Sequence, residues 1–313
     1  MPEDKKLQSR RSYKRLLRNR KINWIKHKVK IARNCVLSIK NRSPKIKILA
    51  TTSLHNLTYR AECLRFIENV MLDRSFELRD YVSSSSLNLK DPVFTFWDEG
   101  VQPDVVKICI GQMKKVFGDR LIVLSKDNMS DYVCFDPKII QHINVVQFSD
   151  LLRLALLYFH GGTWIDSTVW INRDFNNNSV LLSENANKWE VSTWYLRSEP
   201  RNYVMYCWLS DQILYWLCQK SAICYSMVHH FFEMRYHLDA RFKRIVTDEY
   251  DHFDRAEFLG ASRFMTAKSA EIFKENFGNI DLLKLNYREH PLYDHLDLWS
   301  PLGLEKDTSN KLT

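Results

Sequence analysis

The sequence predicts an α/β fold with a mostly parallel central sheet and a helical C-terminal portion. Three stretches of the chain carry this prediction. Residues 93–124 alternate strand, helix and strand, residues 148–169 pass from an apolar helix into a β-branched strand, and residues 203–231 are apolar and aromatic. A strand–helix–strand unit favours parallel strands, with ligands at their carboxyl ends.

The composition indicates a globular protein with a large core. The chain has 313 residues, of which 45% are hydrophobic and 13% aromatic, so it can fold as one large domain or two small ones. Eight glycines and eight prolines are too few for a fibrous or low-complexity protein. Seven cysteines form an odd number without a Cys-x-x-Cys pair, which predicts free thiols in a reducing compartment rather than disulfides or a zinc site.

Two further sequence features lead us to expect a cytoplasmic protein. No stretch approaches the ~20 uninterrupted apolar residues that a transmembrane helix needs. The first residues are charged and lack the apolar core and cleavage site of a signal peptide.

Residues 1–34 carry much of the positive charge of the chain, whose formal net charge is +9. Only Glu3 and Asp4 oppose the lysines and arginines of this tail, and Trp24 and Ile25 are interleaved with them. Three hypotheses remain open. The tail is a solvated basic arm, or an amphipathic helix that contacts an anionic membrane surface. Nucleic-acid binding is the least favoured, because no recognition module accompanies the basic residues.

The next part of the chain is mixed. Residues 45–54 fit either a strand or a linker, and their periodicity does not decide between the two. Residues 60–72 have the spacing of an amphipathic helix. Its apolar face collects Cys63, Phe66, Ile67, Val70 and Met71.

Residues 92–137 predict the first half of a nucleotide-binding α/β domain. A compact strand at 93–97 is followed by Pro103, which suits the first position of a helix. Apolar residues then recur every four positions, at Val105, Cys109, Met113 and Phe117. Gly118 ends this helix, and the next strand covers residues 121–124.

Residues 148–169, with the sequence FSDLLRLALLYFHGGTWIDSTV, predict a buried helix that turns back into a buried strand. Ser149 is a suitable N-cap, and Asp150 then lies in the first turn, where its charge suits the helix dipole. Gly161 and Gly162 end the helix, the first with a left-handed backbone. The β-branched and aromatic residues after the glycines favour a strand.

Asp166 is the one charge within that predicted strand. A buried carboxylate is costly unless it is paired or binds a metal. Asp150 and Arg153 lie three residues apart on one face of the helix, which the glycine turn folds against the strand. Two interpretations are open. Either Asp150 and Arg153 form a structural ion pair while Asp166 caps a turn, or the three side chains form a functional site.

Residues 203–231 predict a helix, or a pair of helices broken near Ser221, with Asp211 as the one acid. Aromatic side chains at this density suit either a core or a surface on which a sugar stacks, and core packing is the commoner use. The histidines that follow lack the spacing of a metal motif such as HExxH, so we interpret them as surface or supporting residues.

The chain resembles the capsular polysaccharide synthesis glycosyltransferases and, more widely, the DXD-containing sugar transferases that include the yeast-type mannosyltransferases. Their shared pattern is a Ser-Asp-x-x-Arg helix, a Gly-Gly turn and a strand that ends in Asp-x-Asp or Asp-x-Thr. The seven matching positions are Ser149, Asp150, Arg153, Gly161, Gly162, Asp166 and Thr168. Further matches at Trp97, Gly100 and Pro103, and at residues 284–288, extend the resemblance over residues 92–290.

The resemblance implies a GT-A-like fold and a glycosyltransferase that retains anomeric configuration. It would move a sugar from a nucleotide-sugar donor to a saccharide or lipid-linked oligosaccharide acceptor, in the biosynthesis of capsule or another surface polysaccharide. A lipid-linked acceptor would give the tail a role at the inner face of the plasma membrane. The alternative is a non-catalytic member of the fold that binds a nucleotide-sugar or a partner enzyme.

The resemblance also assigns the site. The implied catalytic residues are Asp150, Arg153 and Asp166, and the implied donor-binding residues are Trp97, Asp150, Arg153, Gly162 and Thr168. A divalent metal, Mn²⁺ or Mg²⁺, would be held by Asp166 and Thr168. Thr168 stands where the second acid of the pattern is expected, and its neutral hydroxyl is a weaker ligand. Without the resemblance, Trp97 is interpreted as an ordinary core aromatic.

These expectations divide the chain into four parts. They are a basic tail (1–34), a helical or linker region (35–91), a nucleotide-sugar-binding α/β core (92–180) and a helix-rich acceptor-side portion (181–313).

Overall fold

The computed structural model describes residues 63, 66–67, 76–98, 100–175, 179–183, 191–254 and 281–285. The basic tail, residues 1–34, lies outside these ranges, as do Val70 and Met71 of the predicted amphipathic helix. The six cysteines in the described ranges are free thiols. None of the helices described is both long enough and apolar enough to cross a membrane.

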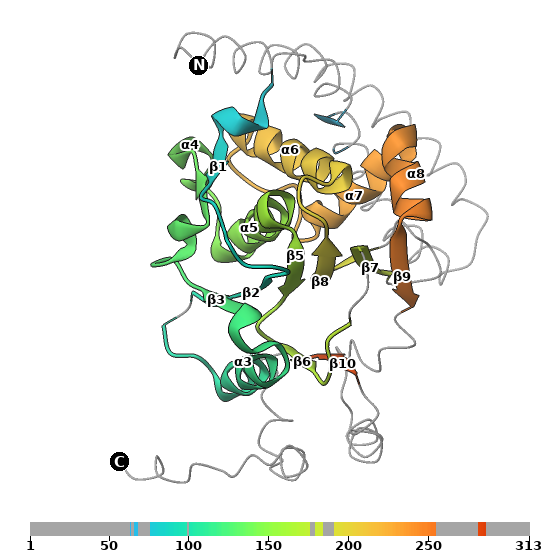
Figure 1. Ribbon diagram of the computed structural model, residues 1–313. Helices are drawn as coiled ribbons and strands as arrows, with labels where there is room; N and C mark the ends of the chain where they lie inside the picture. Colours follow the sequence, from blue (N-terminus) through green and yellow to red (C-terminus); the bar gives the residue numbers. More distant parts are fainter. Residues whose placement is uncertain are drawn as a thin grey trace, which may run out of the picture.

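A six-stranded sheet lies at the centre of the fold (Figure 1). The strand order is β3-β2-β5-β8-β7-β9. The strands are β2 (Val93–Phe96), β3 (Leu121–Leu124), β5 (Gly162–Ile165), β7 (Ser179–Ser183), β8 (Val191–Ser198) and β9 (Tyr250–Asp254). The predicted α/β class is confirmed by this sheet and the helices packed on it.

The predicted parallel character of the sheet is confirmed in part, because one of the six strands, β8, runs against the other five. Strand β2 runs parallel to β3 and β5, and β7 runs parallel to β9, but β8 is antiparallel to both of its neighbours. Only residues 184–190 separate β7 from β8. A parallel pair needs a crossover of a dozen or more residues, so this short connection allows only an antiparallel return.

The strand–helix–strand unit at the start of the sheet follows the sequence prediction. Helix α3 (Asp104–Phe117) connects β2 to β3, and the two strands pair in parallel from Val93↔Leu121 to Phe96↔Leu124. The four apolar residues spaced along α3 are all buried. Gly118, with a φ of 55°, forms the C-cap of α3.

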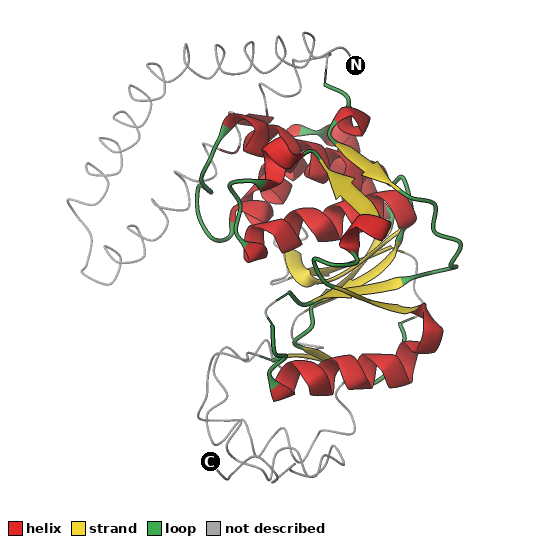
Figure 2. Cartoon of the chain, turned by 90° about the vertical axis from the view of Figure 1, so that its left-hand side faces the viewer, coloured by secondary structure: helices red, strands yellow, loops and turns green. Residues whose placement is uncertain are grey.

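Helices cover both faces of the sheet (Figure 2). Besides α3, the helices are α4 (Pro137–Ile140), α5 (Val145–His160), α6 (Tyr203–Cys218), α7 (Met227–Leu238) and α8 (Ala240–Asp248). One face of the sheet carries the larger core, built mainly by α5, α6 and α7, while α3 covers the other face. Short 3₁₀ helices occur at η1 (Leu78–Asp80), η2 (Gly118–Arg120) and η3 (Met129–Asp131).

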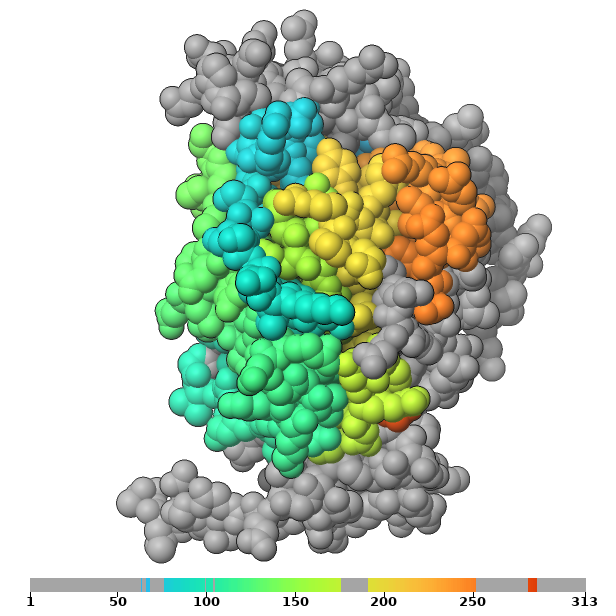
Figure 3. Space-filling view, viewed as in Figure 1, coloured from blue at the N-terminus to red at the C-terminus, as the bar shows by residue number. Residues whose placement is uncertain are grey.

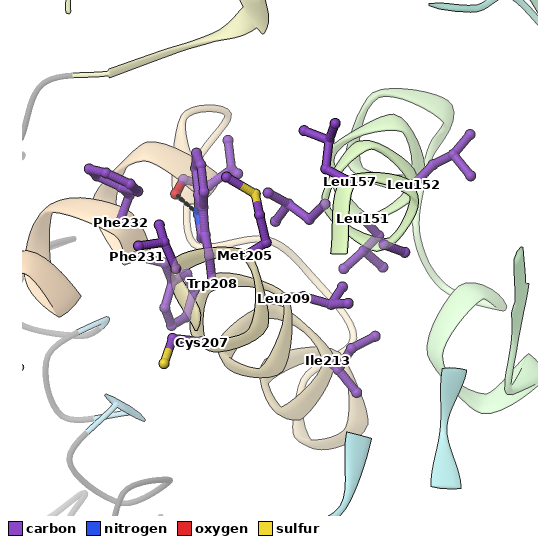
Figure 4. Packing of buried hydrophobic residues seen from close by; sticks show 14 of the residues in the cluster. Leu151, Leu152, Leu157, Met205, Cys207, Trp208, Leu209, Ile213, Phe231 and Phe232 are labelled. Carbon is purple, nitrogen blue, oxygen red and sulfur yellow. Dashed lines mark hydrogen bonds between the residues drawn. The ribbon is translucent and has the colours of Figure 1, made fainter. Parts of the chain in front are cut away.

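The larger core is an interface between α5, α6 and α7 (Figure 4). Leu151 and Leu157 of α5 point towards α6, and the indole of Trp208 on α6 donates a hydrogen bond to the carbonyl of Val228, at 2.8 Å. The Trp208 ring also packs on Phe232 of α7, with centroids 4.7 Å apart. The predicted break near Ser221 into two helices is therefore confirmed. Trp208, Tyr215, Trp216 and Phe231 are buried in the core, whereas Tyr225, between the two helices, is 79% exposed.

The described residues of the predicted N-terminal helix join this core. Cys63, Phe66 and Ile67 are helical and fully or almost fully buried. The Phe66 ring makes edge contacts with Tyr215 and Phe231, with centroids 5.5 and 6.0 Å apart. For these three positions, the apolar face expected from the sequence is confirmed.

Two small antiparallel ribbons flank the main sheet. Strand β1 (Val82–Ser84) pairs with β4 (Val133–Phe135), and β6 (Val169–Ile171) pairs with β10 (Leu282–Lys284). The β6–β10 ribbon shares the smaller core with α3. In Figure 3 the lime-coloured segment around β6 lies beside green α3, and a small red patch of β10 shows at its edge.

Two local predictions around β5 need correction. Ser149 is not the N-cap, because α5 begins at Val145 after Asn144, whose side chain forms a capping box with Gln147. Residues 163–169 are not one strand either. Strand β5 ends at Ile165, and a turn closed by a hydrogen bond from the Val169 amide to the Asp166 carbonyl, at 2.9 Å, separates it from β6.

The predicted boundary at residue 180 falls inside β7, which pairs with both β8 and β9. Residues 180–194 show no clear periodicity, so neither β7 nor β8 could be predicted from the sequence. The main sheet consequently continues from the predicted nucleotide-sugar-binding core into the portion after it.

Candidate active site

Arg153 is a nearly buried side chain beside Asp166 that is held by several hydrogen bonds. It lies on α5, is 5% exposed, and donates from Nη1 to the Thr193 carbonyl at 2.8 Å. Its Nε and Nη2 donate to the carbonyl and hydroxyl of Ser149, at 3.2 and 3.1 Å. The guanidinium also stacks over the Trp164 ring, 5.1 Å from its centroid, a favourable cation–π arrangement. Arg153 therefore presents a fixed positive charge.

Arg153 connects the two predicted acids. Its Nη2 lies 3.2 Å from Oδ1 of Asp150 and 3.5 Å from Oδ1 of Asp166. Asp166 follows the end of β5, where its amide donates to the Trp194 carbonyl at 2.9 Å. The indole of Trp164 donates to Asp166 Oδ1 at 2.8 Å. Asp150, Arg153 and Asp166 therefore lie next to one another, as expected from the sequence.

Lys284 completes this group from the far end of the sequence. Its Nζ donates to Oδ2 of Asp166 at 2.7 Å and to Oγ1 of Thr168 at 2.8 Å. Strand β10 positions Lys284 by pairing it with Val169, and the next amide, of Leu285, donates to the Thr168 carbonyl at 2.8 Å. We call Asp150, Arg153, Asp166, Thr168 and Lys284 the Asp166 cluster.

Lys284 was not predicted as a site residue, although its sequence context carries a signal. Lys284 stands in the run DLLKL as one basic residue among leucines, just as Asp166 is one acid among β-branched and aromatic residues. Two isolated opposite charges in apolar strands suggest a pair, since each is costly to bury alone. Ser149 and Thr193, which hold Arg153, were not assigned these contacts either.

The two carboxyl groups of the cluster have opposite pKa shifts. Burial raises the pKa of Asp150 to about 6, an effect that Arg153 reduces and the charge of Asp166 reinforces. Burial also acts to raise the pKa of Asp166, but the charges of Lys284 and Arg153 outweigh it. With hydrogen bonds from Lys284 and Trp164, they lower the pKa of Asp166 to about 2. At neutral pH Asp166 is firmly ionised, while Asp150 is close to its titration range.

The cluster lies at the carboxyl edge of the parallel strands. Trp97 follows the end of β2, the neighbour of β5, and its amide donates to the Leu124 carbonyl at 3.0 Å. Asp98 next to it accepts a hydrogen bond from the Lys126 amide at 3.0 Å and forms an ion pair with the Lys126 ammonium group. Trp97 is thus at the same edge as Asp166, where α/β folds bind ligands. Its contact with a donor base stays a prediction.

Gly162 does not belong to this group. It begins β5, and at ~3.3 Å per residue it lies about 13 Å along the chain from Asp166. Its φ is 83°, and a Cβ atom there would come within 2.1 Å of the Pro92 carbonyl oxygen. Gly161, with a φ of 69°, is similarly close to Pro200. Close backbone packing accounts for both glycines, and the contact of Gly162 with a donor stays a prediction.

A divalent metal does not fit this group of residues as they are arranged. Asp166 Oδ2 and Thr168 Oγ1, the two predicted ligands, both accept hydrogen bonds from Lys284. A divalent ion roughly 4 Å from one ammonium group is repelled by about 8 kcal/mol at an effective dielectric constant near 20, and Arg153 adds a second positive charge. Over the described parts of the chain, no three His, Cys, Asp or Glu side chains form a metal site.

Comparisons with known proteins agree with the resemblance found in the sequence. Residues 44–295 match the family described as capsular polysaccharide synthesis protein. Comparison with curated proteins and with solved structures gives no match. The family match covers the whole main sheet, the Asp166 cluster and β10. This chain belongs to the capsular polysaccharide synthesis protein family.

Proposed function

We propose that this protein is a glycosyltransferase of capsule or surface polysaccharide biosynthesis. It moves a sugar from a nucleotide-sugar donor to a saccharide or lipid-linked oligosaccharide acceptor. The family match supports the biosynthetic role. The resemblance of the motif positions between Ser149 and Thr168 to DXD-type sugar transferases supports the reaction class.

One observation carries the proposal. Asp150, Arg153 and Asp166 meet at the carboxyl edge of parallel strands, and the carboxyl groups are not sealed from water. The Asp150 and Asp166 side chains are 14% and 23% exposed. A purely structural ion pair would gain nothing from this position, whereas a donor needs polar groups fixed where it can reach them.

The proposed reaction breaks the bond between the anomeric carbon and the donor diphosphate. The nucleoside diphosphate leaves with the bonding electron pair, a bond from the acceptor hydroxyl oxygen to that carbon forms, and the departing diphosphate oxygen takes up the hydroxyl proton. Asp150 accepts hydrogen bonds from donor sugar hydroxyls, and Arg153 orients Asp150 and Asp166 through Nη2. Asp166 stays ionised and fixes the ammonium group of Lys284 beside the donor. Retention of anomeric configuration follows from the resemblance alone.

The basic tail and Trp97 extend the proposal. We propose that residues 1–34 bring the protein to the anionic inner face of the plasma membrane, where a lipid-linked acceptor is available. Trp97, at the edge that carries Asp166, offers an indole face on which a nucleotide base can stack.

The test is turnover of nucleotide-sugars by the full chain. Release of nucleoside diphosphate is measured for a panel of donors, without acceptor and with saccharide acceptors. We expect one donor to be turned over, and Asp166→Ala to reduce the rate by about 100-fold or more, because removing one preorganised hydrogen-bonding group from an active site costs about 10²–10³ in rate.

The matched control is Asp119→Ala. Asp119 is exposed on η2, which precedes β3 and so lies at the amino end of that strand, away from the carboxyl edge that carries Asp166. It should turn over the donor at the wild-type rate. Equal turnover in Asp166→Ala would remove Asp166 from the site. Donor binding without turnover across all acceptors would favour the non-catalytic alternative.

A further inference from the structure

Lys284 occupies the position that a metal ion was expected to take. Its Nζ lies between Asp166 Oδ2 and Thr168 Oγ1, at 2.7 and 2.8 Å, and these are the two predicted metal ligands. An ammonium group brings a positive charge to the same two oxygens that a divalent cation would use. The charge that a departing diphosphate requires is therefore already present in the chain.

The ammonium group of Lys284 is also able to bind a ligand, because it is partly exposed and has a further N–H donor. Lysine has three N–H donors, and the described contacts of Lys284 use two of them, on Asp166 and Thr168. The Lys284 side chain is 27% exposed, more than any other charged side chain of the Asp166 cluster. A third donor on a partly exposed ammonium group suits an anionic oxygen, and lysine is a common phosphate ligand.

The fixed geometry strengthens this argument. Asp166 is held by Trp164, Arg153 and its own turn, and Thr168 is held by Leu285. Lys284 sits on a strand that pairs with β6 directly after that turn. The backbone of Lys284 is fixed by strand pairing, and its ammonium group is fixed by Asp166 and Thr168. The ammonium group is therefore preorganised before any ligand binds.

We infer that Lys284 takes the place of a divalent metal and holds the diphosphate of the donor. This inference rests on the proposed function and deepens it. Lys284 Nζ donates to a diphosphate oxygen of the bound donor and neutralises the negative charge that builds up there when the bond to the anomeric carbon breaks. Asp166 and Thr168 position Lys284, and donor binding needs no Mn²⁺ or Mg²⁺.

The experiment is calorimetric titration of the full chain with UDP, GDP, CDP and ADP, once with EDTA and once with Mn²⁺. We expect one nucleoside diphosphate to bind with the same affinity in both conditions. Lys284→Met should weaken that binding about ten- to hundredfold, which is the effect of losing one charge-assisted hydrogen bond. Lys115→Met, which removes an exposed lysine from α3, is the matched control and should bind as wild type does.

The outcomes separate the two proposals. Wild-type binding that requires Mn²⁺ overturns the inference on Lys284 and leaves the proposed transferase in place. Unchanged binding in a folded Lys284→Met variant overturns it as well. Failure of every nucleotide to bind, with or without Mn²⁺, overturns the proposed function. The wild-type comparison of EDTA with Mn²⁺ decides the inference even where Lys284→Met does not fold.

Discussion

Two arginine–carboxylate clusters in this protein share their chemistry and differ in their surroundings. In the Asp166 cluster Arg153 joins two acids at the edge of the sheet. In the helical layer Arg235 of α7 joins Asp211 of α6 to Asp239, and we call these three the Asp211 cluster. Each places a nearly buried guanidinium between two carboxylates.

The Asp211 cluster is closed. Asp211 is fully buried and accepts hydrogen bonds from Nε of Arg235, at 2.9 Å, and from Nη2 of the same residue. Asp239 accepts from the amides of Arg241 and Phe242, at 3.0 and 3.1 Å, and so caps α8, while Tyr203 donates to its other oxygen at 2.9 Å. Its described hydrogen bonds join α6, α7 and α8.

The Asp166 cluster is open, because its acids and Lys284 keep partial contact with water. The difference shows that a buried ion pair alone says little about function. The two clusters differ because the Asp166 cluster keeps solvent-accessible groups that can form further hydrogen bonds, namely its carboxylates and the Lys284 ammonium group. From this we expect changes in the Asp211 cluster to affect stability, and changes in the Asp166 cluster to affect activity more than stability.

The largest effect on stability is expected for Asp211→Asn. The variant leaves the guanidinium of Arg235 buried without a full counter-charge and turns amide N–H groups towards its donors. Breaking a buried pair of this kind costs about 3–5 kcal/mol. The free energy of unfolding in urea measures the loss. Asp248→Asn, at an exposed position on α8, should stay within about 0.5 kcal/mol of wild type. A loss no larger than that of the control would show that the closed cluster does not hold the helices together.

Asp166→Asn should destabilise the fold by only about 1–2 kcal/mol. The amide oxygen can still accept from Trp164, Arg153 keeps Asp150 and the Thr193 carbonyl, and Lys284 can turn towards water. The same urea measurement applies, alongside the donor assay, where this variant should lose most of its turnover. If Asp166→Asn lost as much stability as Asp211→Asn, the distinction between an open and a closed cluster would fail.

The smallest effect is a pH dependence that belongs to Asp150. Its folded pKa of about 6 lies above its ordinary value of 3.8. Between these values the folded protein holds a proton that the unfolded chain has released, so the free energy of unfolding falls as pH rises from about 4 to about 6. Because Asp150 is partly solvated, we expect a change of about 1 kcal/mol.

Asp150→Asn should remove that slope, which urea unfolding across the same pH window would reveal. Asp166 acts in the opposite direction and at lower pH. Its lowered pKa makes its stabilisation complete above about pH 4, and that stabilisation is lost as pH falls towards 2. A slope that persists in Asp150→Asn would assign the titration to another group.

Elements whose bounds depend on nearby residues, such as helix α3, could be predicted from the local sequence pattern. Helix α3 repeats its apolar residues every four positions between a proline and a glycine, so its buried face and its end followed from the sequence. The start of α5 did not, because Ser149 and Asn144 are both good N-caps. Asn144 is the cap in the structure, and Gln147 completes its capping box. The Ser149 hydroxyl contacts Arg153 instead.

Strand pairing and the full site depend on contacts between distant residues. The antiparallel position of β8 between β5 and β7 is a matter of sheet assembly, which the periodicity of residues 180–194 does not encode. Asp150 and Arg153 could be placed near Asp166 because a glycine turn joins their elements. Lys284 could not, since no local rule connects β10 to β6.

The distance of Lys284 from Asp166 along the chain affects how the protein is made. The two residues are 118 positions apart. A ribosome that adds about 5–20 residues per second needs about 6 to 24 s for that stretch. During this time the nascent chain has Asp166 and Arg153 but not Lys284. The last charge of the cluster therefore arrives late in translation, with the strand that closes the ribbon on β6.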